Sequence, residues 1–139
     1  WSIEYDLPVA IHSRDAIAEC ISCIKNVGEQ HLRGVFHSFG GTVEELDGIL
    51  SLKNFMLGIN GVVTFKNSTL PTVLKETDLS SIIIETDSPY LAPVPYRGKR
   101  NESSYTLNVV TKLAEIYGLP VEEVGQITTE NGEKLFALK

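Results

Sequence analysis

The sequence predicts an α/β fold of four consecutive βα units, and three short segments carry this prediction. Each runs from an apolar stretch into a residue that can bind a divalent metal ion: PVAIH ends at His12, GVFH at His37 and SIIIETD at Asp87. The intervals between these residues are 25 and 50 positions, and a βα unit occupies roughly 25–30 residues. The intervals therefore correspond to one unit and then two, with FMLGI (55–59) as the intervening strand.

The length of the chain fits half of a closed parallel barrel. A (β/α)8 barrel typically needs about 250 residues, whereas this chain has 139 and is expected to form a single domain over residues 1–139. The first residue is Trp1 rather than Met, and the opening segment WSIEYD (1–6) has the character of a helix end. We therefore expect an N-terminal truncation, with four parallel strands and helices on one outer face.

The first unit is expected to begin with a strand over residues 8–12. An amphipathic helix over about 14–27 follows and ends at Gly28, a favoured residue at helix C-termini. The helix carries Cys20 and Cys23 as a lone CxxC motif. A redox motif or half of a zinc site is the alternative, but no second CxxC exists, so we interpret both thiols as small apolar residues. Free thiols fit a reducing, cytoplasmic compartment.

The second unit begins with a strand over residues 34–38. Thr42 then opens the segment T-V-E-E, in which Glu45 has the spacing of a capping box. In that motif the hydroxyl of the first residue and the carboxylate three positions later satisfy each other's backbone N–H groups. We therefore expect a helix from Thr42 to about Leu52.

The third and fourth units complete the predicted sheet. A strand over residues 55–60 runs into GINGVVTFKNS, where Gly58 and Gly61 permit close backbone approach or unusual dihedral angles. A short helix near 71–77 leads to the fourth strand, predicted over 81–87. Strand order is expected to follow chain order, because sequential parallel strands are joined by right-handed crossovers.

A long irregular segment, SPYLAPVPYRGKRNESS, follows Asp87. Its prolines prevent regular structure, and it carries a cluster of Lys and Arg in a chain that has only 12 of them. A long βα loop of this kind is a natural substrate-binding element. Helices are then predicted over 104–117, 121–127 and 130–136.

Composition excludes two classes of protein. With 42% hydrophobic and 22% charged residues and no apolar run near the roughly 20 residues that span a bilayer, the chain has no predicted association with a membrane. A net charge of −6 argues against a broad nucleic-acid surface, which needs clustered Lys and Arg to release counterions. A phosphate substrate must therefore be held locally, and bound metal ions can do this.

The three candidate ligands each have an ordinary alternative. An isolated strand-end histidine such as His12 or His37 more often makes a local hydrogen bond, and Asp87 fits a turn in ETDSP. Their joint placement at strand ends favours a metal site, because imidazoles and a carboxylate suit Zn²⁺, Mn²⁺ or similar ions. His31 lies in a predicted surface connection and is assigned no role.

The stretches LPVAIHSRDA, GVFHSFGG, GINGVVTFKNS, IIIETDSPYLAPVPYRGKRNE and TTENGEKLF resemble the C-terminal half of the TatD-type metal-dependent deoxyribonuclease family. The resemblance covers essentially all of the chain. It implies a (β/α)8 barrel of the amidohydrolase type in which one or two divalent ions (Zn, Mg or Mn) hydrolyse phosphodiester bonds. At matching positions it implies that His12, His37 and Asp87 are metal ligands. The family's N-terminal His-x-His pair and strand-end acidic residue have no counterpart here, and Ser38 and Ser103 replace residues that are often Cys and Pro.

The implied mechanism gives further residues candidate roles. Asp87 is expected to be catalytic, binding metal and orienting or deprotonating the attacking water. Arg14, two residues after a ligand, is placed to contact phosphate, and a pairing with Asp15 or solvent is the alternative. Glu85 shares a strand face with Asp87 by the two-residue period, so it is either a carboxylate that supports the ligands or an interior barrel residue.

The long loop supplies the remaining candidates. Arg97, with Tyr90 and Tyr96, is placed to grip or stack on a nucleotide, although a packed loop anchor is the favoured role for Tyr90. Asn101 is a candidate for substrate binding and Glu102 for supporting the site, and both could instead anchor the loop beneath it.

Two rival classes remain open beside the enzyme. One is a non-catalytic α/β module that binds an anion at helix N-termini, although the sequence has no G-x-G-x-x-G or P-loop motif. The other is a structural fragment of a larger enzyme. The expected partners are DNA or another phosphodiester, and either the N-terminal half of the barrel or a second copy, because a half-barrel leaves two strand edges and an apolar interior exposed.

Overall fold

Four parallel strands form the sheet, in the order in which they occur in the chain. The structure is a computed structural model that describes residues 1–138. The strands are β1 (Val9–His12), β2 (Gly34–His37), β3 (Phe55–Ile59) and β4 (Ile82–Ile84), hydrogen-bonded in the order β1-β2-β3-β4. Every pairing is parallel, and the register sets His12 beside His37. The predicted strand order is confirmed, and both histidines lie at the carboxyl end of the sheet.

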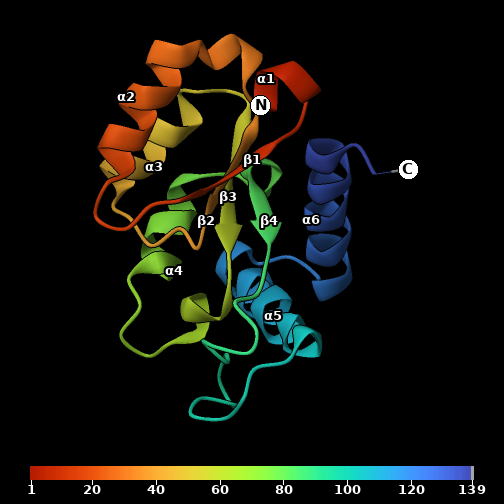
Figure 1. Cartoon of the computed structure of the whole chain (residues 1–139). Helices are drawn as coiled ribbons and strands as arrows, with labels where there is room; N and C mark the ends of the chain where they lie inside the picture. Colours follow the sequence, from red (N-terminus) through yellow and green to blue (C-terminus); the bar gives the residue numbers. More distant parts are fainter. Residues whose placement is uncertain (139) are drawn as a thin grey trace.

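Helices connect successive strands and follow the last one (Figure 1). The α-helices are α1 (Ser2–Tyr5), α2 (Ile17–Val27), α3 (Val43–Leu50), α4 (Leu70–Val73), α5 (Thr106–Tyr117) and α6 (Val121–Phe136). Short 3-10 helices are η1 (Glu29–His31), η2 (Gly61–Thr64), η3 (Leu74–Glu76), η4 (Leu79–Ser81) and η5 (Ser103–Tyr105). In Figure 1, α2 and α3 lie together on one side of the sheet, α6 lies beside β4, and a long loop hangs beyond the strand ends before α5.

The two faces of the sheet are buried to different extents. Side chains of one face, among them Phe36, Leu57 and Ile82, join a large core with residues of helices α2 to α6. The opposite face contributes Val35, Met56 and Ile83 to a small second cluster, which Leu135 of α6 completes. Because successive strand residues point to opposite faces, this second face is the interior of the predicted barrel. The helices lie on the outer face as predicted, apart from this contact at the end of α6.

The fourth strand is shorter than predicted, because it ends at Ile84 rather than at residue 87. The backbone N–H of Glu85 still donates to Ile59 O at 3.0 Å. The chain then turns: Ser88 N donates to Thr86 Oγ1 at 3.2 Å. Hydroxyl groups that bond nearby backbone N–H groups favour turns over strands, so Asp87 lies in a loop.

Two helix predictions also need correction. The helix expected from residue 14 begins at Ile17, because Asp15 has a left-handed φ of 52° that no α-helix accommodates. The two helices expected over 121–127 and 130–136 are one helix, α6. The expected gap covered residues 128–129, but the side chain of Thr128 is buried and donates to Val124 O at 2.8 Å within the helix. Its hydroxyl therefore does not compete with the helical backbone.

Local signals at helix ends are confirmed. The capping box at α3 is complete, since Thr42 N donates to Glu45 Oε2 at 2.8 Å and Glu45 N donates to Thr42 Oγ1 at 3.3 Å. Gly28 ends α2 with a φ of 112°. Cys20 packs against the core, but Cys23 is exposed, so only one of the two thiols behaves as an apolar core residue.

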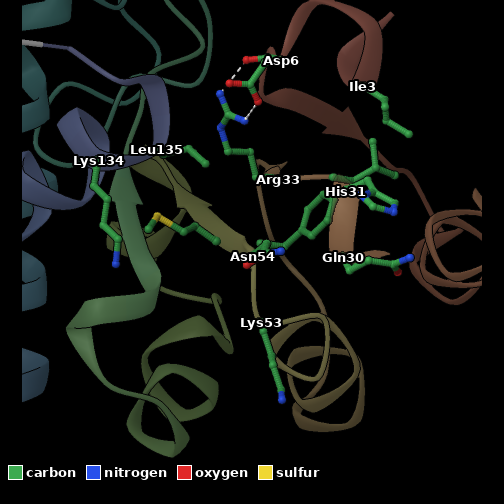
Figure 2. Close-up of a pocket in the computed structure, with 12 residues that line it drawn as sticks. Ile3, Asp6, Gln30, His31, Arg33, Lys53, Asn54, Lys134 and Leu135 are labelled. Carbon is green, nitrogen blue, oxygen red and sulfur yellow. Dashed lines mark hydrogen bonds and ion pairs between the residues drawn. The ribbon is translucent and has the colours of Figure 1, made fainter. Parts of the chain in front are cut away.

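A hollow of about 600 Å³ opens at the amino end of the strands, opposite His12 and His37, and His31 is part of its lining. Figure 2 shows that it is bounded by the start of the chain, the segment before β2, the start of β3 and the end of α6. Arg33 is held there by the carboxylate of Asp6, whereas Lys53 and Lys134 form no ion pair with any residue in 1–138. No helix in the same range is both long and apolar enough to cross a bilayer.

Candidate metal centre

His37 lies between two carboxylates at the carboxyl end of the sheet. It is the last residue of β2, and Glu85 and Asp87 follow β4. The Nδ1 atom of His37 is 2.9 Å from Glu85 Oε1, and its Nε2 atom is 2.9 Å from Asp87 Oδ1. The sequence placed these three residues at one end of the sheet, and the structure brings them into direct contact.

A neutral imidazole can satisfy only one of the two contacts of His37. A neutral ring has one N–H, so one nitrogen would face a carboxylate oxygen with no hydrogen between them. A second proton or a metal ion resolves this conflict. Burial lowers the pKa of His37, but Glu85 and Asp87 together raise it more, so this pKa lies above its ordinary value. The site therefore favours a positive charge at His37.

Glu85 orients the imidazole from the side opposite Asp87. Its Oε1 atom also accepts a hydrogen bond from the backbone N–H of Ser38 at 2.5 Å. Burial raises the pKa of Glu85, and the contacts with His37 and the Ser38 N–H offset part of that rise. Gly58 makes room for this carboxylate, because a Cβ atom there would lie 2.2 Å from Glu85 Oε2. The close approach predicted at Gly58 is therefore observed, and a Cβ atom at Gly61 would similarly lie 2.5 Å from Leu91 O.

Asn60 is a residue of this site that the sequence analysis missed. It follows β3, and only 2% of its surface is exposed. Its Nδ2 atom donates to Asp87 Oδ2 at 2.6 Å and to Ser38 Oγ at 2.8 Å. The available signal was its position, since Asn60 follows its strand as directly as His12 and His37 end theirs. In this segment only Gly58 and Gly61 were given a role, that of permitting close backbone approach or unusual dihedral angles.

His12 is close to the site but outside its hydrogen-bond network. It ends β1, is exposed, and stacks on His37 with ring centroids 5.5 Å apart. Across residues 1–138, no three His, Cys, Asp or Glu side chains are grouped so that they could hold a metal ion. The structure thus joins His37 to Asp87 and places His12 alongside them, while their role as metal ligands stays a prediction.

The donor set has the chemistry of part of a metal site. Metal-binding histidines usually donate the ring N–H opposite the metal to a carboxylate or carbonyl, and Glu85 is placed to accept from Nδ1 of His37. The remaining pair, His37 Nε2 and Asp87 Oδ1, is separated by 2.9 Å. That spacing allows both atoms to bond one ion at about 2.0–2.2 Å. Two donors fit a metal, and further ligands are needed to complete its coordination.

A small hollow adjoins the histidines on the side of β1 and β2. It has a volume of about 200 Å³, and its lining includes Ser13, Arg14, Ser38 and Glu45. Arg14 is exposed and forms no ion pair within the described part of the chain, so the alternative pairing with Asp15 is not seen. The loop that begins near residue 14 therefore leaves this guanidinium in the lining of the small hollow.

Hydrogen bonds from side chains of the long loop hold the loop in place. Asn101 is 4% exposed and donates through Nδ2 to Tyr90 O at 2.7 Å and to Thr86 Oγ1 at 3.0 Å. These contacts support the loop-anchor alternative for Asn101 rather than direct substrate contact. Glu102 is exposed, and its backbone N–H donates to Asn101 Oδ1 at 2.9 Å. Within residues 1–138, the Glu102 side chain makes no hydrogen bond or ion pair that would support the site as predicted.

The aromatic residues of the loop have different environments from those expected. Tyr96 stacks on Tyr105 with centroids 3.9 Å apart, and the guanidinium of Arg97 lies 3.8 Å from the ring centroid of Phe65. Tyr90 is 75% exposed. Tyr96 is therefore the packed aromatic residue of the loop, Arg97 is exposed but stacked on a ring, and the prediction that Tyr90 is packed is wrong. A basic residue stacked on a ring retains its charge, so Arg97 still contributes positive potential.

Known proteins resemble this chain over nearly all of its length. It is 41% identical over 136 residues to "Uncharacterized metal-dependent hydrolase YabD" of Bacillus subtilis, covering 97% of this chain and 53% of that protein. It is 37% identical over 134 residues to "Uncharacterized metal-dependent hydrolase YcfH" of Escherichia coli K12, covering 96% and 50%. The chain thus spans about half the length of the curated relatives it matches.

Solved structures show the same fold. The crystal structure of YJJV, a TatD homolog from Escherichia coli, superposes with a TM-score of 0.89 at 26% identity, covering 99% of this chain and 53% of that one. A TatD family hydrolase from Entamoeba histolytica gives a TM-score of 0.85 at 22% identity, covering 97% and 52%. The four strands and their helices are half of a (β/α)8 barrel. A sequence model of the family described as TatD related DNase matches residues 1–137, and the chain belongs to that family.

Proposed function

We propose that this chain is the C-terminal half of a divalent-metal-dependent hydrolase that cleaves phosphodiester bonds of DNA. The observation that carries the proposal is His37, which faces a carboxylate oxygen at 2.9 Å from each ring nitrogen. Such a ring needs a cation or second proton at Nε2, and a divalent ion meets that need. The family described as TatD related DNase supports the same reaction class.

The residues that would hold the metal are His37, Asp87 and His12. A bound ion would lower the pKa of its water toward about 7 and neutralise phosphoryl oxygens. Glu85 fixes the ring of His37 so that Nε2 points toward Asp87. Asp87 presents one oxygen to His37 while Asn60 holds the other. This chain therefore supplies ligands whose orientation is set before any substrate arrives.

The substrate is held by local positive charge on an acidic chain. Arg14 lies beside the 200 Å³ hollow next to the histidines, where a guanidinium can donate two parallel hydrogen bonds to a phosphate. Arg97 adds charge from the long loop. We infer that these two residues position phosphates on either side of the reacting bond, while Asn101 and Glu102 maintain the loop that carries Arg97.

The missing coordination is proposed to come from a complementary half-barrel. Within residues 1–138, β1 pairs only with β2 and β4 only with β3, so the sheet has two open edges. The 600 Å³ hollow of Figure 2 opens on the interior face, with Met56 and Leu135 in its lining. The curated relatives are about twice as long as the matched region. The partner is thus the N-terminal half of such a barrel or, failing that, a second copy.

The free thiols of Cys20 and Cys23 support a cytoplasmic location.

The proposal is tested by metal content and phosphodiester hydrolysis. The chain is mixed with Zn²⁺, Mn²⁺ or Mg²⁺ and assayed on bis(4-nitrophenyl) phosphate and on a DNA oligonucleotide, alone and together with the N-terminal half of the YabD relative. We expect weak metal binding and slight activity alone, and a large increase with the added half. His37→Ala should abolish the increase, whereas Lys112→Ala, which removes an ion pair with Glu115 on the surface of α5, should retain it.

Two outcomes would overturn the proposal. One is a chain that takes up no divalent metal under either condition, which would favour a structural fragment. The other is hydrolysis that survives His37→Ala.

A further inference from the structure

We propose that Asn60 is a positioning residue that holds the Asp87 carboxylate in the orientation needed for metal binding. It donates to Asp87 Oδ2 at 2.6 Å, while Asp87 Oδ1 faces His37 Nε2 at 2.9 Å. The two oxygens of one carboxylate therefore have separate partners. This inference rests on the proposed function only in taking Asp87 as a metal ligand.

The orientation of the Asn60 amide follows from its surroundings. Its Oδ1 atom accepts a hydrogen bond from Val62 N at 3.0 Å, at the start of η2. A backbone N–H can only donate, so the atom facing it must be the amide oxygen. The amide nitrogen then points toward Asp87 and Ser38, where it meets two acceptors. The reversed amide would set its oxygen against the Asp87 carboxylate.

Asp87 needs such a partner because the sheet does not fix it. β4 ends at Ile84, and Asp87 lies in the turn that follows, where its carbonyl accepts from Tyr90 N at 2.7 Å. Its carboxylate is about one-fifth exposed. Asn60 belongs to the neighbouring strand end and is almost completely buried. A rigid amide thus restrains a carboxylate that stands on a loop.

Asn60 also closes a ring of contacts across three strand ends. His37 contacts Glu85 and Asp87, Ser38 N donates to Glu85, and Asn60 links Ser38 to Asp87. Each link joins residues from different strand ends except the covalent step from His37 to Ser38. Loss of the amide opens the ring at Asp87 and leaves Glu85 and His37 connected. The expected defect is therefore in ligand orientation rather than in formation of the sheet.

The test compares the affinity of the full chain for Zn²⁺ with its stability. Asn60→Ala is expected to weaken Zn²⁺ binding by about 10–100-fold, as is typical when a residue that orients a metal ligand is removed. Asn131→Ala is the matched control, because Asn131 also donates two partly buried hydrogen bonds through Nδ2. They go to Leu79 O at 2.7 Å and to Ile82 O at 2.8 Å. Those contacts join α6 to the segment around β4. The control should lose thermal stability and retain Zn²⁺ affinity.

A second variant separates orientation from folding. Asn60→Ser keeps an oxygen that can accept from Val62 N, as serine does at helix starts, but its side chain is too short to reach Asp87 as well. It should fold more stably than Asn60→Ala and still bind Zn²⁺ weakly.

The outcomes distinguish this inference from the proposed function. Unchanged Zn²⁺ affinity in both Asn60 variants, with binding by the unaltered chain, would overturn the role of Asn60 alone. A loss of affinity in Asn131→Ala equal to that in Asn60→Ala would also overturn it, because the effect would then be one of general stability. An unaltered chain that binds no Zn²⁺, either alone or with the N-terminal half of the YabD relative, would overturn the proposed function and this inference with it.

Discussion

The two histidines at the carboxyl end of the sheet occupy equivalent positions and have very different surroundings. His37 and His12 end neighbouring strands and are paired in register. His37 contacts two carboxylates, and its neighbours Ser38 and Asn60 extend the network. His12 is exposed, and its described contact is the stacked ring of His37. One side of the site is complete, and the other is open.

This difference shows that strand position alone does not make a ligand site. The sheet brings both histidines to one end, but the partners of His37 come from residues just beyond β3 and β4. β1 is an edge strand within the described residues, so it has a neighbour on one side only. We propose that partners for His12 come from beyond that edge, where the complementary half-barrel would pair. On this proposal the asymmetry of the site and the open edge of the sheet have one cause.

The largest expected effect comes from completing the open side. Addition of the N-terminal half of the YabD relative should convert a weakly associating, metal-poor chain into a defined complex with metal bound. The physical reason is that new ligands would surround His12, while pairing at β1 would remove an edge that favours aggregation. Size-exclusion chromatography with metal analysis measures both changes. A chain that is monomeric, cooperative in unfolding and fully active alone would contradict the half-barrel explanation.

The next effect tests the complete side, at Gly58. Gly58→Ala places a Cβ atom within 2.2 Å of Glu85 Oε2, so the carboxylate must move away from His37 and the Ser38 N–H. We expect a destabilisation of about 1–3 kcal/mol, as in other overpacked sites, together with weaker metal binding. Urea unfolding and Zn²⁺ titration of the same samples give the two quantities.

Gly125→Ala is the control for Gly58→Ala. It lies in α6, where an added Cβ atom would be 4.0 Å from Val110 Cγ1, an ordinary contact. Alanine in a helix interior is favoured over glycine by roughly 0.5–1 kcal/mol, so this variant should be slightly stabilised with unchanged metal affinity. If Gly58→Ala were stabilised as Gly125→Ala is expected to be, the Glu85 carboxylate would have moved aside without a loss of stability.

The sequence predicted what depends on short-range patterns and missed what depends on contacts between loops. Apolar runs located the four strands, and the spacing of Thr42 and Glu45 predicted the start of α3. The length of β4 was overestimated because side-chain hydrogen bonding by Thr86 turns the chain. Asn60 was missed because its partners, Ser38 and Asp87, are 22 and 27 positions away. Such pairings exist only once the strands are aligned.

The same limit applies to the long loop. Three prolines and a cluster of cations predicted an irregular, substrate-facing segment, but not which aromatic residue packs. Tyr96 is packed because it meets Tyr105 of η5, and Tyr90 is exposed because Asn101 holds its backbone rather than its ring. The sequence alone indicates that an aromatic residue tends to pack, but it does not identify the residue against which it packs.

The smallest expected effect concerns Tyr117, which belongs to the helical layer and to neither side of the site. Its hydroxyl donates to Leu74 O at 2.7 Å, and burial, with a smaller contribution from Asp78, raises its pKa well above the ordinary value. Folding therefore favours the neutral phenol. The contribution of Tyr117 to stability is fully present below the ordinary pKa near 10 and is lost as the pH rises above it toward the higher folded-state pKa. Tyr117→Phe should cost about 0.5–1.5 kcal/mol at neutral pH, the usual worth of one hydrogen bond.

The difference in unfolding free energy between the unaltered chain and this variant should shrink as urea unfolding is repeated at pH values above 10. Tyr5→Phe, at a position that is 62% exposed, corrects for alkaline effects shared by all tyrosines. A difference that stayed constant with pH would mean that Tyr117 is not held in its neutral form. Because Tyr117 makes its hydrogen bond within the helical layer, unchanged Zn²⁺ affinity in this variant would show that this layer and the metal centre respond separately to substitution.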